Sequence, residues 1–142
     1  MTDYMGLLRQ SDDPVHYDAP PDLDLEAAGS RMRAFAHALS IALGVSLRTE
    51  SGVLLQDANY HGEVFLPSTG AIESSIRFSN FGNLVTIFRT EDVRSDWVNV
   101  ITDLIEEHGY SYVPEAVLQQ SYTGRNKGIS GVKDWFQRYF VC

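Results

Sequence analysis

The sequence predicts an α+β fold, a single domain in which an antiparallel β-sheet of about five strands carries helices packed on one face. Three observations support this prediction. Apolar residues recur at helical spacing between Leu25 and Leu43. Short β-type segments then follow one another from Val45 to Arg89, joined by brief links rich in turn formers. Two further helical stripes complete the pattern, one before Gly109 and one at the end of the chain.

The first confident element is a helix that begins near Leu25. Its apolar face comprises Leu25, Ala28, Met32, Phe35, Leu39 and Leu43. These residues recur at helical intervals, which places them on one side of a helix. Gly44 stands where a glycine in the left-handed conformation commonly ends a helix. We therefore expect the helix to end at this glycine.

A β-rich region follows this helix. The segments VSLRT and GVLLQ flank the turn formers Glu50-Ser51-Gly52 and are expected to form a hairpin. GEVFLP is a third strand that stops at Pro67. AIESSIRFS alternates, with Ile72, Ser74, Ile76 and Phe78 on one face, and NLVTIFR pairs back with it. Links this short require antiparallel neighbours, because a parallel pair needs a connection of about a dozen residues or more.

The C-terminal part is predicted to hold two more amphipathic helices. The first stripe comprises Trp97, Val98, Ile101, Leu104, Ile105 and His108 and ends at Gly109. YSYV is expected to form a short strand, and Pro114 opens a brief helix through EAVLQQ. The last stripe comprises Val132, Trp135, Phe136, Tyr139 and Phe140, and its spacing predicts that it faces the core.

The run Gly124–Gly131 raises the question of an anion-binding loop. A phosphate-binding P-loop reads G-x-x-x-x-G-K-[ST] and follows a buried strand. Here Lys127 precedes its glycine, and the run follows the polar segment QQSYT. We therefore expect a solvated turn at this position.

Most of the acidic excess lies at the N-terminus. The chain of 142 residues has a net charge of −8, and residues 1–30 hold seven acidic residues against one arginine. SDDPVHYDAPPDLDLE contains three prolines and shows no sustained period. We therefore expect residues 1–24 to form an extended acidic arm and residues 25–142 to form one α+β domain.

Charge and hydropathy narrow the classes of partner. Nucleic acid is disfavoured, because phosphate binding requires clustered lysine and arginine side chains. An acidic chain suits a basic protein partner. The longest apolar runs, such as NLVTIF, are far shorter than the ~20 residues of a membrane span, so no membrane partner is expected. The N-terminus lacks the features of a signal peptide, and we expect a cytoplasmic protein.

No catalytic or metal-binding residues can be assigned, and no cofactor is expected. The histidines are spread along the chain without metal-ligand spacing, as His16, His37, His61 and His108. HGE, from His61 to Glu63, has the H-x-E half of a zinc deaminase site, but the lone Cys142 cannot supply the P-C-x-x-C ligands. There is no G-x-S-x-G nucleophile elbow. The sequence therefore predicts a binding protein rather than an enzyme.

Acidic and aromatic loops are the expected contact surface for a protein partner. The predicted partner-binding residues are Asp57, Asn59, Tyr60, His61, Glu63 and Glu73. They lie in two predicted loops, Asp57–Glu63 and Pro67–Glu73, and loops commonly carry recognition. An exposed Tyr60 with acidic neighbours would anchor a basic partner, with help from the N-terminal arm.

In its general character the chain resembles the small immunity proteins of bacterial polymorphic-toxin and contact-dependent inhibition systems. The shared features are acidity, a single domain, an expected cytoplasmic location and the lack of catalytic motifs. The resemblance implies a protein that binds a cognate toxin domain and blocks its active site or its access to substrate. Charge complementarity to a basic toxin would speed capture.

Two alternative functions stay open. A secretion-effector chaperone has similar size, acidity and α+β character, and it would bind an unfolded client segment as a homodimer. A small-molecule-binding domain or enzyme would hold its ligand in a pocket between the sheet and the helices.

Overall fold

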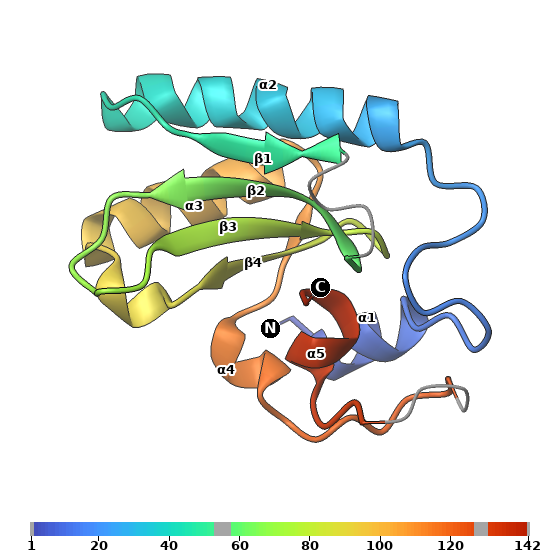
Figure 1. The fold of residues 1–142 in the computed structure, drawn as a ribbon. Helices are drawn as coiled ribbons and strands as arrows, with labels where there is room; N and C mark the ends of the chain where they lie inside the picture. Colours follow the sequence, from blue (N-terminus) through green and yellow to red (C-terminus); the bar gives the residue numbers. More distant parts are fainter. Residues whose placement is uncertain (1, 53–57, 127–130, 142) are drawn as a thin grey trace.

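The computed structural model describes residues 2–52, 58–126 and 131–141, and it has the α+β architecture expected from the sequence (Figure 1). Its helices are α1 (Tyr4–Gln10), α2 (Leu25–Leu43), the short 3₁₀ helix η2 (Thr90–Asp92), α3 (Ser95–Glu107), α4 (Glu115–Leu118) and α5 (Trp135–Tyr139). Its strands are β1 (Thr49–Ser51), β2 (Tyr60–Leu66), β3 (Ser74–Ser79), β4 (Leu84–Phe88) and β5 (Ser111–Tyr112).

Among the described residues, five strands form one mixed, mostly antiparallel sheet in the order β1-β2-β3-β4-β5. Strands β1 to β4 pair antiparallel with their neighbours, as predicted for sequential strands joined by short links. Strand β5 instead runs parallel to β4, with Leu84 opposite Ser111. The connection between these two strands contains α3, so it is long enough to return the chain in the same direction.

The two long helices, α2 and α3, cover one face of the sheet (Figure 1). The first core, between these helices and the sheet, includes Met32, Phe35, Leu39, Ile101, Ile105, Val64, Ile76, Phe78, Val85 and Ile87. Asp24 caps α2 by accepting a hydrogen bond from the backbone N–H of Ala27. Gly44 ends the helix with a φ of 70°, which confirms the predicted end.

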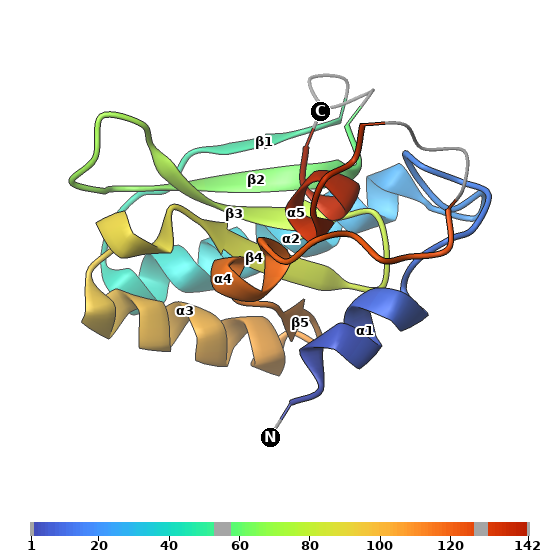
Figure 2. The same cartoon turned by 90° about the horizontal axis from the view of Figure 1, so that it is seen from below.

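The C-terminal segment, which contains α4 and α5, covers part of the opposite face of the sheet (Figure 2). A second core there includes Leu8, Leu118, Trp135, Tyr139 and Phe140, all fully buried. Arg77, on that face of β3, donates a hydrogen bond to the carbonyl of Phe140 at 2.8 Å. The prediction that the last aromatic stripe faces a core is therefore confirmed.

The N-terminal region is folded onto this second core rather than extended. Helix α1 buries Leu8 completely. The carboxylate of Asp12 accepts a hydrogen bond from Arg138 Nε at 2.8 Å, and both side chains are fully buried. The expectation of an extended arm over residues 1–24 is therefore wrong at α1 and Asp12. Their partners lie at the opposite end of the chain, where local periodicity carries no information about them.

Two details of the β-rich region also differ from expectation. Glu50 and Ser51, expected in a turn, belong to β1, where Glu50 lies opposite Glu63 of β2. The strand expected at GVLLQ lies almost wholly outside the described residues. Ile72, expected on the inner face of β3, precedes that strand and is 57% exposed. Alternation of side chains indicates a strand but not the residue at which it begins.

Candidate functional site

The structure buries most of the side chains predicted to contact a partner. The exposed fraction is 1% for Asn59, 4% for Tyr60, 9% for His61 and 5% for Glu63. Strand β2 already begins at Tyr60, so most of the loop expected at Asp57–Glu63 is strand. Of the predicted residues within the described part of the chain, Glu73 alone is exposed, and Asp57 lies outside it. The expectation of an exposed Tyr60 is therefore wrong.

Asn59 holds the C-terminal segment in place. Its Nδ2 donates to the carbonyls of Gln137 and Arg138, at 2.9 and 2.6 Å. Its Oδ1 accepts from the backbone N–H of Val141 at 2.6 Å. With its side-chain amide bonded internally, Asn59 serves the fold.

Glu63 is likewise part of an internal network. Its Oε2 accepts hydrogen bonds from Ser75 Oγ at 2.5 Å and from Arg77 Nε at 3.0 Å. The guanidinium of Arg77 lies over the ring of Tyr60, with 5.1 Å between Cζ and the ring centroid. A buried carboxylate needs such a partner, because burying an isolated charge is costly.

His61 is placed differently, because it sits at a β-bulge. Tyr60 lies opposite Ser79 and Gly62 lies opposite Phe78, which leaves His61 as the extra residue of β2. A bulge interrupts the alternation of side chains and can re-aim one of them. The ring of His61 lies 6.3 Å from that of Phe78, a member of the first core. His61 therefore faces the side of the sheet that α2 covers.

The pocket that His61 enters, called here the His61 pocket, lies between α2 and the adjoining ends of β2 and β3. It is lined by Leu23, Ala28, Arg31, His61, Ser79, Asn80, Gly82, Asn83 and Tyr110. Its volume of about 160 Å³ is that of about five water molecules. Among the described lining residues none is an aspartate or glutamate, so Arg31 gives the pocket a positive charge within an acidic chain.

Four polar atoms of this pocket make no hydrogen bond of good geometry within the described part of the chain. They are His61 Nδ1 and Nε2, Asn80 Oδ1 and the Tyr110 hydroxyl. The three side chains are 9%, 8% and 4% exposed, respectively. Buried polar groups are nearly always hydrogen-bonded, and leaving one unpaired costs about 1–3 kcal/mol. Their concentration in one pocket indicates a place where a ligand or ordered water completes the hydrogen bonding.

Contacts on other sides fix the orientation of Asn80 and Tyr110. Asn80 Nδ2 donates to the carbonyls of Asp18 and Ala58, at 2.8 and 3.2 Å. Because both partners are acceptors, the amide oxygen is the atom left without a partner. The Tyr110 ring packs edge-on against Phe78, with ring centroids 5.0 Å apart. Both unpartnered oxygens are thus held by rigid neighbours.

Arg31 supplies the charge of the pocket from an exposed position on α2. Its two terminal nitrogens donate to Asn83 Oδ1 and to the carbonyl of His108, each at 2.9 Å. Its Cζ lies 4.1 Å from the centroid of the Tyr110 ring. A guanidinium has five N–H donors, so these two bonds use part of its capacity. A planar cation held in this way suits recognition of a carboxylate.

Burial favours the neutral forms of the two buried titratable groups. Burial lowers the pKa of His61, and weak hydrogen-bonding interactions with the Asn80 side chain and the Ser79 backbone partly offset this. Burial raises the pKa of Tyr110, and the positive charge of Arg31 partly offsets this. Neutral imidazole has one donor and one acceptor nitrogen, whereas the protonated ring has two donors. Protonation of His61 would therefore add both a charge and a donor to the pocket.

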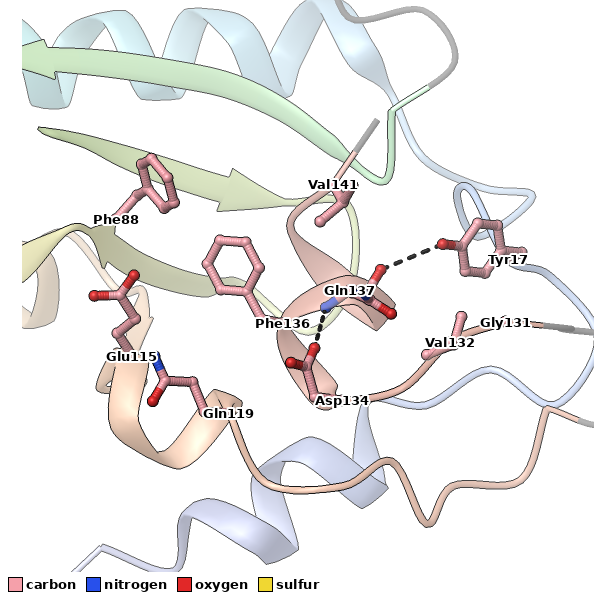
Figure 3. Close-up of a pocket in the computed structure, with 10 residues that line it drawn as sticks. All are labelled: Tyr17, Phe88, Glu115, Gln119, Gly131, Val132, Asp134, Phe136, Gln137 and Val141. Carbon is pink, nitrogen blue, oxygen red and sulfur yellow. Dashed lines mark hydrogen bonds between the residues drawn. The ribbon is translucent and has the colours of Figure 1, made fainter. Parts of the chain in front are cut away.

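A larger groove beside α4 and α5 is a weaker candidate (Figure 3). It has a volume of about 470 Å³, and the rings of Phe88 and Phe136 point toward one another within it, with centroids 5.8 Å apart. Two of its polar side chains are hydrogen-bonded within the fold, since Asp134 accepts from the N–H of Gln137 and Tyr17 donates to the Gln137 carbonyl (Figure 3). Among its described lining residues no buried polar side-chain atom is unpartnered.

Sequence reasoning identified His61 but missed the residues that surround it. Arg31 lies on a helix, Asn80 in the link NFGN and Tyr110 beside a short strand, and no local pattern connects them. One signal was present in Gly62, because a glycine inside a strand often marks a bulge or a close approach. Indeed, a Cβ on Gly62 would lie 3.0 Å from Met32 Cγ.

Comparison with protein-family models, with curated proteins and with solved structures finds no match for this chain. Within the described residues, no three histidine, cysteine or acidic side chains come together as a set of metal ligands. No helix in that part of the chain combines the length and the apolar character that crossing a membrane requires. The geometry of the His61 pocket is therefore the feature of the molecule that bears on its function.

Proposed function

We propose that this chain is a non-enzymatic binding protein that holds a small polar ligand in the His61 pocket. The observation that carries the proposal is the convergence, in one cavity beneath α2, of four polar atoms that make no good hydrogen bond to any described residue. A fold that leaves these groups unpaired gives up stability, which a ligand with matching donors and acceptors restores. The position agrees with the pocket between sheet and helices that a small-molecule-binding domain requires.

The chemistry of the lining favours binding over catalysis. A histidine acts as a general base when a nucleophile lies within reach and a third group orients the ring. Ser79 carries the aliphatic hydroxyl among the described lining residues, and its Oγ already donates to the Asn59 carbonyl and accepts from the N–H of Phe81. No carboxylate of the described lining orients His61. The groups present can recognise a ligand but do not form a nucleophile and base pair.

A titration followed by NMR tests the proposal. The uniformly ¹⁵N-labelled protein is titrated with small carboxylates, amides and polyols, among them glycolate, glycolamide and glycerol. At least one probe should shift the amide signals of His61, Asn80 and Tyr110 together. Tyr110→Phe should weaken that probe severalfold because it removes an unpartnered hydroxyl, whereas Tyr17→Phe, the same change outside the pocket, should not. A panel that leaves all three amides unmoved, with ordered water alone in the pocket, would contradict the proposal.

A second candidate is the toxin-neutralising role that the resemblance to immunity proteins implies, with a basic toxin domain as partner. The observation that favours it is the solvent face of α3. Every charged residue between Ser95 and Glu107 is acidic and exposed, namely Asp96, Asp103, Glu106 and Glu107. This surface replaces Asp57–Glu63 as the proposed contact region, because the described part of that segment is buried. Complementary charge would steer a basic partner to α3.

Co-expression with the product of the adjacent gene tests this second candidate. Asp103→Lys combined with Glu107→Lys should abolish rescue from toxicity and co-purification. Asp22→Lys combined with Glu26→Lys makes the same change in net charge on another exposed surface and should leave rescue largely intact. Rescue that survives the α3 reversal would rule out this face, and a harmless neighbour that does not co-purify would rule out the role. Glu63→Lys is unsuitable as a probe, because it would break the internal pair with Arg77.

A further inference from the structure

We infer that the ligand of the His61 pocket is a small hydroxycarboxylate, that is, a carboxylate with a hydroxyl group on the adjacent carbon. The inference rests on the proposed ligand-binding function and specifies the chemistry of the same site. It follows from the charge, the balance of donors and acceptors, and the size of the cavity.

The charge of the lining selects an anion. Arg31 is the permanently charged residue among the described lining residues, and none of these is acidic. Two further donors line the cavity, the hydroxyl of Tyr110 and the N–H of the neutral His61 ring. Charge-assisted hydrogen bonds from a guanidinium to a carboxylate are stronger than neutral ones and are directional. The carboxylate is therefore expected between Arg31, Tyr110 and His61.

The acceptor in the pocket selects the second group of the ligand. Asn80 Oδ1 accepts no hydrogen bond of good geometry within the described residues, and its orientation is set by the two carbonyls that its Nδ2 reaches. A ligand hydroxyl supplies one donor to this oxygen. An ammonium group carries three N–H donors and a positive charge, which the charge of Arg31 disfavours. A hydroxyl group therefore fits this position better than an amino group.

The volume limits the ligand to very few atoms. The cavity has room for about five water molecules, so a two- or three-carbon acid fits and a nucleotide does not. A ligand this small binds with modest affinity, because binding free energy is limited by the number of its atoms. Weak but selective binding is the result to look for.

The same geometry predicts that acid strengthens binding. His61 is faced by Arg31 from α2, by Tyr110 after α3 and by Asn80 and Ser79 at the end of β3. None of these groups is a carboxylate that could compensate a protonated ring. A bound anion would provide that compensation, so binding and protonation of His61 favour each other.

The test titrates the full-length protein with four probes of similar size and follows the amide chemical shifts. Each probe is taken to about 50 mM, because the affinity is modest. Glycolate carries both groups, acetate lacks the hydroxyl, glycolamide lacks the charge, and glycine replaces the hydroxyl with an ammonium. Glycolate should bind about fivefold or more tightly than each of the others, as expected for one added hydrogen bond or charge interaction. The affinity for glycolate should rise as the pH is lowered from about 7.5 to about 5.5. Over this interval the carboxylic acids of the probes stay ionised, because they protonate at lower pH.

Two variants of α2 provide a matched control. Arg31→Gln should weaken glycolate about tenfold or more, because it removes a charge-assisted contact. Arg33→Gln makes the same change in net charge on a side chain that contacts Ser30 and Ser51 instead, and it should have little effect. His61→Gln should remove the dependence of glycolate affinity on pH.

Three results would overturn the inference. Equal binding of acetate and glycolate would exclude a role for the hydroxyl. An equal loss of glycolate affinity in Arg31→Gln and Arg33→Gln would mean that net charge, and not a contact with Arg31, attracts the anion. Binding of glycolamide at the pocket amides without glycolate would overturn the anion while leaving the proposed ligand-binding function intact. A different result would contradict the proposed ligand-binding function itself: none of the small carboxylates, amides and polyols shifts the amide signals of His61, Asn80 and Tyr110.

Discussion

Two buried tyrosines that differ in their hydrogen bonding allow a direct test of the pocket. The hydroxyl of Tyr139 donates to the carbonyl of Leu8 at 2.6 Å, and the side chain is fully buried. Tyr139→Phe therefore removes a hydrogen bond and leaves a carbonyl without its donor, which costs about 1–3 kcal/mol. Tyr110 is 4% exposed, but its hydroxyl has no partner within the described residues. Tyr110→Phe should change the free energy of unfolding by less than ~0.5 kcal/mol, or stabilise the fold slightly.

Urea unfolding of the ligand-free protein and the two variants measures this difference, with the m value checked for two-state behaviour. The variants have the same chemical change and nearly the same burial, so each serves as the control of the other. An equal loss of stability in Tyr110→Phe and Tyr139→Phe would mean that the Tyr110 hydroxyl is hydrogen-bonded in the free protein. The reasoning that assigns it to a ligand would then be refuted.

Three other substitutions test the rest of the account. Asp12→Asn should lower the free energy of unfolding in urea by about 3–5 kcal/mol, because it leaves the fully buried Arg138 without its carboxylate partner. A loss under ~1 kcal/mol would contradict this pairing. Gly44→Ala should cost about 1 kcal/mol, because the left-handed φ of 70° is unfavourable for alanine; the added methyl group itself would meet no other atom. Unchanged stability would argue against the left-handed cap at Gly44. His61→Gln should flatten the acid side of the stability profile of the ligand-free protein. Burial lowers the pKa of His61 in the folded protein, so the unfolded chain takes up this proton at higher pH and wild-type stability falls as pH drops below about 6.5. Identical pH profiles of stability for the wild type and His61→Gln would contradict this.

Much of the fold could be predicted because its elements carry local signals. The period of α2 and the glycine that ends it are both written in consecutive residues. The same holds for the alternation of β3, where Ile76 and Phe78 enter the first core and Arg77 faces the other side. The aromatic spacing of the C-terminal segment likewise predicted a buried face, and Trp135, Tyr139 and Phe140 are fully buried. Each of these features depends on neighbours within a few turns or strands.

The features that local patterns missed are those assembled from distant segments. Leu8 and Asp12 are buried by the last residues of the chain, so the acidic region expected to be an extended arm is partly internal. Tyr60, placed in a loop among polar residues, is in a strand because its polar neighbours Asn59 and Glu63 have internal partners. Polarity in a sequence indicates exposure only where the fold offers no such partner.

The His61 pocket shows the same limit for function. Its lining residues come from α2 and the residues just before it, from β2, from the end of β3 and the turn that follows, and from the segment after α3, and no spacing rule connects them. A bulge of one residue decides that His61 faces α2 rather than the C-terminal segment, and bulges are hard to read from one sequence. The role given to His61 from the sequence, contact with a partner, depended on an exposure that the structure does not have.

A crystal structure of the full-length protein grown with glycolate tests the central claim most directly. The account predicts density for one glycolate in the His61 pocket, with its carboxylate against Arg31 and the Tyr110 hydroxyl. Its hydroxyl group should lie within hydrogen-bonding distance of Asn80 Oδ1. Density for water molecules alone at a glycolate concentration that saturates the NMR titration, or glycolate bound only elsewhere on the surface, would contradict it.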